Sequence, residues 1–90
     1  MSNATGQYLA TNGDTALFGA NCLLYTVNVT KANTSAVVTV YNAQSAVAAN
    51  TVAVIDASVK GSYSFWDSRM PNGVYAVLSG ANAGVTIVAE

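Results

Sequence analysis

Hydrophobic and polar side chains alternate with a period of two along most of this 90-residue chain. Segment 22–30 is the clearest case, because its apolar and polar residues fall on opposite sides of an extended backbone. The apolar side is expected to hold Leu23, Tyr25, Val27 and Val29, and the polar side Thr26, Asn28 and Thr30. This pattern is typical of a β-strand with one face in water.

Five further segments have strand character, namely 36–42, 51–57, 62–67, 74–79 and 85–89. Val38 and Val40 are expected to point inward, while Val37 and Tyr41 leave the second face of that strand partly apolar. The connections carry turn residues such as Pro71 and Gly73 and are too short for crossover helices, so the pairing should be antiparallel. We predict an all-β fold, either a small antiparallel β-sandwich or a jelly-roll-like barrel, of about six to eight strands.

Three regions have weaker patterns. Residues 6–18 are expected to contain one or two short strands around the turn Thr11-Asn12-Gly13-Asp14, and residues 43–50 to form a loop with at most one helical turn. Residues 1–6 are polar and are interpreted as a flexible N-terminal arm. We expect one domain over residues 1–90, since a chain of this length supports a single core.

Composition limits the function. The chain is 52% hydrophobic and only 8% charged, against a usual charged share of roughly 25%. With so few charges, some apolar surface should remain for an oligomer or a docked partner. A net charge of −1 and three dispersed cations, Lys31, Lys60 and Arg69, argue against binding to nucleic acid.

Membrane insertion and secretion are not expected either. No segment approaches the roughly 20 consecutive apolar residues of a membrane-spanning helix. The N-terminal sequence has no basic start followed by an apolar stretch, so it does not resemble a secretory signal, and synthesis in the cytoplasm is expected.

Catalysis is improbable for this composition. The chain has no histidine and one cysteine, Cys22, so it offers no intrachain disulfide and no cluster for a metal or cofactor. Cys22 begins an apolar strand with no basic neighbour in sequence and is expected to be buried and unactivated. The remaining general bases, Asp14, Asp56, Asp67 and Glu90, are best interpreted as solvated acids at the ends of strands and of the chain. We therefore expect that the protein is not an enzyme.

An aromatic cluster is the most distinctive local feature. Tyr63 and Phe65 should face one side of their strand and Trp66 the other, just before Arg69 and Met70. Trp66 could cover the open end of the core, lie in an interface, or stack on a sugar. The candidate interface residues are Trp66, Arg69, Met70, Tyr75, Tyr41 and Leu24.

Six segments carry a resemblance to a known class of proteins: 25–29, 38–42, 52–56, 61–65, 71–80 and 85–88. Their strand order, with Asn72-Gly73-Val74-Tyr75 leading to Ser79-Gly80, resembles the small β-sandwich virion proteins of tailed bacteriophages over about three quarters of the chain. The resemblance implies a head decoration or cement protein on the capsid surface, assembled as a trimer and bound to the major capsid protein. It implies no catalytic residue and no cofactor.

A different interpretation of the same segments stays open. Tail and fibre proteins use similar sandwiches, and such a module could bind a glycan through Trp66, Tyr63 or Tyr75.

Overall fold

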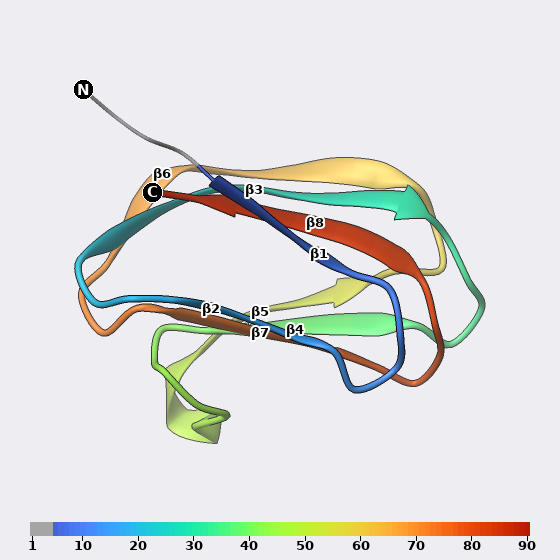
Figure 1. The fold of residues 1–90 in the computed structure, drawn as a ribbon, viewed down its shortest axis with the longest axis horizontal. Helices are drawn as coiled ribbons and strands as arrows, with labels where there is room; N and C mark the ends of the chain where they lie inside the picture. Colours follow the sequence, from blue (N-terminus) through green and yellow to red (C-terminus); the bar gives the residue numbers. More distant parts are fainter. Residues whose placement is uncertain (1–4) are drawn as a thin grey trace.

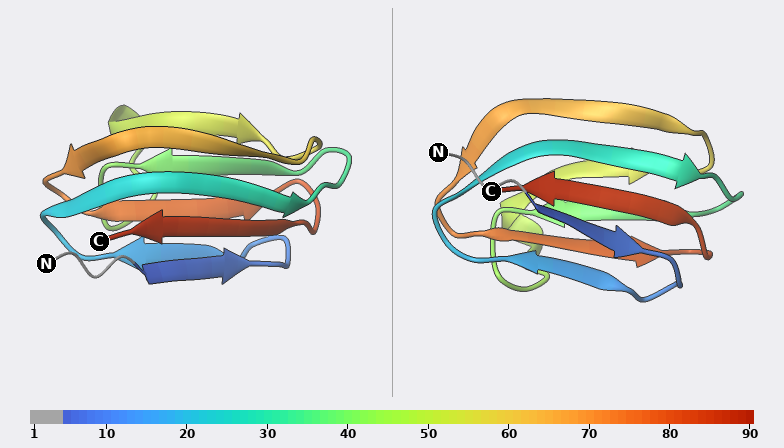
Figure 2. Two further views of the ribbon diagram at one scale, coloured as in Figure 1. Left: turned by 90° about the horizontal axis from the view of Figure 1, so that it is seen from above. Right: turned by 45° about the horizontal axis from the view of Figure 1, so that its top comes forward.

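The computed structural model describes residues 5–90, apart from the side chains of residues 66 and 67, as two β-sheets packed face to face (Figure 1). Sheet A contains, in spatial order, β1 (Thr5–Leu9), β8 (Gly84–Ala89), β3 (Cys22–Lys31) and β6 (Gly61–Met70). Sheet B contains β2 (Thr15–Phe18), β7 (Val74–Ser79), β4 (Val37–Tyr41) and β5 (Thr51–Asp56). Neighbouring strands are antiparallel, and Figure 2 shows the two layers from above. The predicted all-β sandwich is confirmed.

The first four strands pair with the last four in reverse order, as the two arms of one long β-hairpin would. Strand β1 pairs with β8, β2 with β7, β3 with β6, and β4 with β5. Successive pairs then alternate between the sheets, because β1–β8 and β3–β6 lie in sheet A while β2–β7 and β4–β5 lie in sheet B. This wrapped hairpin of eight strands is the arrangement of a jelly roll.

The core lies between the sheets and is a single apolar cluster. Both sheets contribute to it, and Val38 and Val40 point inward as predicted. Every buried side chain among the described residues is apolar. Burial of apolar surface is thus the main stabilising contribution between the sheets. The largest fully buried members are Leu9, Leu24, Leu78, Ile87, Val27, Val38, Val40, Val74 and Val85.

Strand β3 contains a bulge at Tyr25. Its register against both β6 and β8 shifts between Leu24 and Thr26. Extra residues at such a point reset the alternation of side chains along the strand. The buried residues are therefore even-numbered before the bulge and odd-numbered after it, namely Cys22, Leu24, Val27 and Val29.

This bulge overturns one prediction from the sequence. Simple alternation places Leu23 and Tyr25 on the core face, but both are only partly buried, and Leu24 occupies the core position instead. The Tyr25 hydroxyl donates a hydrogen bond to Glu90 Oε1 at 2.5 Å, just beyond the end of β8. An unbroken period of two cannot hold for a strand that changes phase.

The remaining predictions about local structure are largely confirmed. Strands β1 and β2 flank the expected turn at residues 11–14, where Asp14 Oδ2 accepts hydrogen bonds from the backbone N–H of Ala10 and Thr11. These two bonds lower the pKa of Asp14. The connection after β4 contains one 3-10 turn, η1 (Ala48–Asn50).

The predicted N-terminal arm does not extend through residue 6. Thr5 and Gly6 belong to β1 and pair with Ala89 and Val88 of β8. Residues 1–4 of the arm lie outside the described residues.

Candidate interaction surface

The outward-facing side of sheet B is unusually apolar. Strand registers place its side chains in three rows across the sheet, opposite the buried residues that alternate with them. We call this surface the B face. Its rows are Leu17–Tyr75–Tyr41, Thr15–Val77–Thr39–Val54, and Ser79–Val37–Asp56. Leu17 is 48% exposed and Val54 is 66% exposed, so large apolar groups at both edges of the B face are open to solvent.

Two tyrosines lie side by side in one end row of the B face, on its inner strands. Tyr41 and Tyr75 are directly opposite each other on β4 and β7. Their ring centroids are 6.1 Å apart and the rings are tilted by 41°. Aromatic pairs at this separation have a favourable interaction beyond their burial, so the two rings stabilise each other at this end of the face.

Charge is confined to one corner of the B face. Among its described side chains only Asp56 is ionisable as an acid or a base near neutral pH. The Asp56 carboxylate accepts a hydrogen bond from the Ser58 N–H at 2.9 Å, and its pKa is lowered by bonds from the Ser58 side chain and backbone. The acid is thus held at the end of β5, away from the tyrosines. Depletion of charge from a central patch is typical of the core of a protein interface.

The outward-facing side of sheet A has a different character. Its registers place hydroxyl and amide side chains at most positions, including Thr26, Asn28, Ser62, Ser64 and Thr86. The Ser62 hydroxyl donates a hydrogen bond to Asn28 Oδ1 across β3 and β6. The two outer surfaces of the sandwich therefore differ in their main composition: sheet A carries mostly hydroxyl and amide groups beside Tyr8 and Val88, and sheet B carries mostly apolar groups beside its threonines, Ser79 and Asp56.

The sandwich has two open sides, where an edge strand of sheet A lies beside an edge strand of sheet B, and these two sides also differ. Between β1 and β2, the Gln7 side chain donates from Nε2 to Leu17 O at 2.8 Å and accepts from Leu17 N–H at 3.2 Å. This amide satisfies backbone groups of the edge strand β2 and ties the two sheets together.

Between β5 and β6, an open cleft of about 720 Å³ separates the two edge strands. It is lined by residues 53–56 of β5 and 62–65 of β6. Val54 lines the cleft and belongs to the B face, so the two apolar surfaces are continuous around the edge of sheet B.

The six candidate interface residues separate into distinct environments. Tyr41 and Tyr75 come together on the B face, although they are far apart in the sequence. Arg69 is exposed, but it lies on β6 of sheet A. The side chain of Trp66 lies outside the described residues.

Leu24 and Met70 are core residues, contrary to their selection as interface residues. Leu24 is 0% exposed and Met70 is 5% exposed, so neither side chain is accessible to a partner. Leu24 points inward because of the bulge in β3, and Met70 pairs with the buried Cys22.

Several members of the B face were missed by the sequence analysis. Leu17, Val54 and Val77 lie in segments with strand character, but the alternation of residues alone gives none of them an outward position. Their signal is the presence of apolar residues at both parities of one strand, as in Val74–Ser79, where an ordinary exposed sheet would alternate with polar residues.

The described residues offer few groups that could bind a metal ion or act as a nucleophile. Among them, no group of three or more histidine, cysteine, aspartate or glutamate side chains is placed to hold a metal ion. Cys22 is buried, and desolvation raises the pKa of its thiol, which keeps it protonated and unreactive near neutral pH.

Two of the residues considered for glycan binding are not neighbours. Tyr63 lines the cleft between β5 and β6, whereas Tyr75 lies on β7 in an end row of the B face. The structure does not bring them into one site.

Comparisons of the chain with models of protein families, with curated proteins and with solved structures found no match. Within the described residues, no helix has the length and apolar character needed to cross a membrane.

Proposed function

We propose that this chain is a structural subunit that assembles through the B face and carries out no reaction. The observation that supports this proposal best is the contrast between the outer surfaces of the two sheets. One surface carries mostly hydroxyl and amide groups, with Tyr8 and Val88 among them. The other carries two tyrosines, one leucine and three valines, together with two threonines, one serine and a single acid at its corner. Exposed apolar surface that is contiguous on one side of a small protein marks an interaction site.

The surface area of the chain is consistent with more than one contact. A standard interface buries about 800 Å² on each partner, which is about a sixth of the 4643 Å² that this chain exposes. A cyclic trimer needs two different patches on each copy, because its interfaces are heterologous. The B face and the cleft between β5 and β6 are two such patches, and they share Val54.

For the biological setting we propose the virion of a tailed bacteriophage. The chain would be a head decoration or cement protein that forms a trimer and binds the major capsid protein. Support comes from the resemblance described above and, by analogy only, from the use of jelly rolls in viral capsid domains. A cement protein holds neighbouring subunits together, which requires a rigid sandwich with weakly charged contact surfaces.

The setting is tested on purified virions of the phage that encodes the chain. Mass spectrometry of the particles and near-atomic imaging are expected to find the chain on the head, at a fixed copy number for each capsomer. Particles assembled without it should lose infectivity faster on heating. Absence of the chain from purified virions, or its presence only in the tail, would contradict the proposed role on the head.

A further inference from the structure

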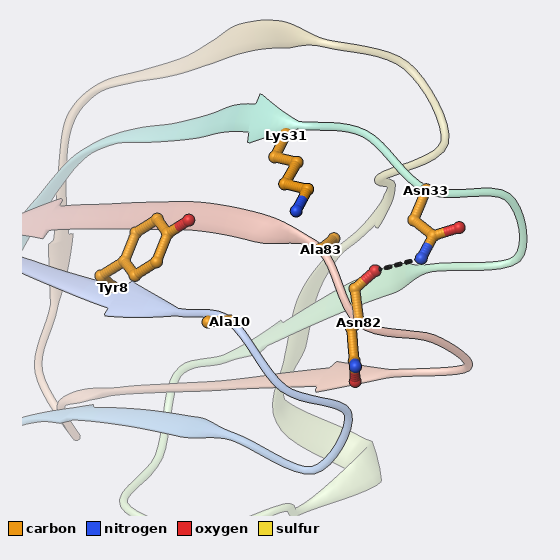
Figure 3. A pocket seen from close by; sticks show the side chains of 6 residues that line it. All are labelled: Tyr8, Ala10, Lys31, Asn33, Asn82 and Ala83. Atoms are coloured by element: carbon orange, nitrogen blue, oxygen red, sulfur yellow. Dashed lines mark hydrogen bonds between the residues drawn. The ribbon is translucent and has the colours of Figure 1, made fainter.

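A second, smaller site lies at one end of the sandwich, away from the B face. It is a pocket of about 290 Å³ lined by Tyr8, Ala10, Lys31, Asn33, Asn82 and Ala83 (Figure 3). These residues come from the end of β1, the end of β3 and the connection into β8. Binding residues are often carried on loops that a rigid sandwich holds in place. This volume is at the small end of the range for ligand pockets, which suits a single ring.

Hydrogen bonds fix the orientation of the two asparagines. Asn33 Nδ2 donates to Asn82 O at 2.6 Å, and the backbone N–H of Asn12 donates to Asn82 Oδ1 at 2.7 Å. Each bond assigns the amide unambiguously, since a backbone carbonyl only accepts and a backbone N–H only donates. Asn33 Oδ1 therefore remains as an acceptor and Asn82 Nδ2 as a donor, and neither makes a hydrogen bond within the described residues.

Tyr8 and Lys31 form the other half of the pocket. Figure 3 shows the Tyr8 hydroxyl and the Lys31 amine reaching over β8 from strands on either side of it. They approach above Gly84, where a Cβ atom would overlap the Tyr8 hydroxyl and lie 2.9 Å from Lys31 Cβ. The absence of a side chain at Gly84 is what gives the tyrosine its position.

The charge in the pocket is positive. Lys31 lines it and makes no ion pair with a described residue, and no acid is among the lining residues. The nearby Asp14 carboxylate is engaged by the backbone N–H groups of Ala10 and Thr11. An anionic group that enters the pocket would thus meet an ammonium group without having to displace a carboxylate.

We propose that this pocket binds one acidic monosaccharide. The Lys31 ammonium group pairs with the carboxylate of the sugar. Figure 3 shows the free Asn33 oxygen and the Asn82 amide on opposite sides of the hydrogen bond that joins the two residues, so Asn33 Oδ1 would accept from one sugar hydroxyl and Asn82 Nδ2 would donate to a different, non-adjacent one. Tyr8, which is 58% exposed, offers an aromatic surface and a hydroxyl beside them. This inference goes beyond the proposed assembly and does not depend on it.

The test is a titration of the ¹⁵N-labelled full chain monitored by amide chemical shifts in NMR spectra. The probes are glucuronate, galacturonate and N-acetylneuraminate, with glucose and acetate as matched ligands that lack the carboxylate or the hydroxyls. At least one acidic sugar is expected to saturate shifts at residues 8–10, 31–33 and 82–84. Glucose and acetate should each bind at least tenfold more weakly.

Lys31→Met removes the charge and keeps most of the aliphatic stem, and Lys60→Met is the control, since Lys60 is outside the pocket. Lys31→Met is expected to weaken binding of the acidic sugar at least tenfold, and Lys60→Met less than twofold. The amide spectrum of each variant reports whether it is folded. The proposal is overturned if none of the three acidic sugars shifts these amides, if the shifts map elsewhere, or if Lys31→Met binds as the wild type does.

Discussion

Replacing Gly80 with alanine is expected to destabilise the fold by about 3–5 kcal/mol, a large share of the stability of a small domain. Gly80 lies in the connection between β7 and β8 and has a φ of +84°, which favours glycine. A Cβ atom there would also overlap the Ser35 carbonyl oxygen. Since the obstacle is backbone, it cannot move away as the end of a flexible side chain could.

Gly13→Ala is the matched control for this prediction. Gly13 has a similar φ of +98°, but a Cβ atom at this position meets nothing within 4 Å. The variant should therefore lose only the roughly 1–2 kcal/mol that a left-handed conformation costs. Urea unfolding at one fixed protein concentration measures both variants, because association would add to the apparent stability. Equal losses in the two variants would show that Gly80 does not pack against Ser35 as described.

Leu24→Ala is expected to lower the free energy of unfolding by about 2–5 kcal/mol. The Leu24 side chain is fully buried between the sheets, so its removal leaves a cavity in addition to the lost burial. The measurement is the midpoint and slope of urea unfolding, compared with the wild type under the same conditions.

Leu23→Ala is the neighbouring control, because the bulge at Tyr25 places this leucine outside the core. Its loss should be below about 1.5 kcal/mol, as for a partly exposed side chain. A larger loss at position 23 than at position 24 would mean that β3 follows the simple alternation without the bulge.

Leu23 and Leu24 show which parts of this fold can be predicted from the sequence and which cannot. A period of two identified the strands and the inward valines of β4 because that strand is regular across its inner positions. It failed at Leu23 because a bulge leaves no clear mark in a run of apolar residues. The jelly-roll pairing was equally out of reach, since connecting two strands by a short loop does not decide whether they lie in the same sheet.

The candidate sites depend on contacts between distant segments. The sequence shows that Tyr41 makes the second face of its strand partly apolar and that Tyr75 is an aromatic candidate for an interface. Only the antiparallel register of β4 and β7 brings the two rings together. The pocket at the end of the sandwich depends on Asn33 and Asn82, which are 49 positions apart and joined by one hydrogen bond. Local patterns carry no information about such contacts.

Two threonine variants test which outer surface of the sandwich forms the contact between copies of the chain. Thr39 lies between Val54 and Val77 in the middle of the B face, and Thr26 lies between Ser64 and Val88 on the outside of sheet A. Both residues are partly buried on inner strands, so Thr39→Lys and Thr26→Lys make the same chemical change in matched positions. A lysine at a close contact between apolar faces brings an unpaired charge into the interface, which weakens association strongly.

Sedimentation equilibrium of the purified chain across a range of concentrations tests the role of the B face most directly. The wild type and Thr26→Lys are expected to sediment as the same oligomer of the 9.2 kDa chain. For Thr39→Lys, the dissociation constant of this oligomer is expected to be at least tenfold higher. A wild-type chain that remains monomeric at every concentration would contradict self-association through this surface. Equal dissociation of the two lysine variants would contradict the assignment of the contact to sheet B.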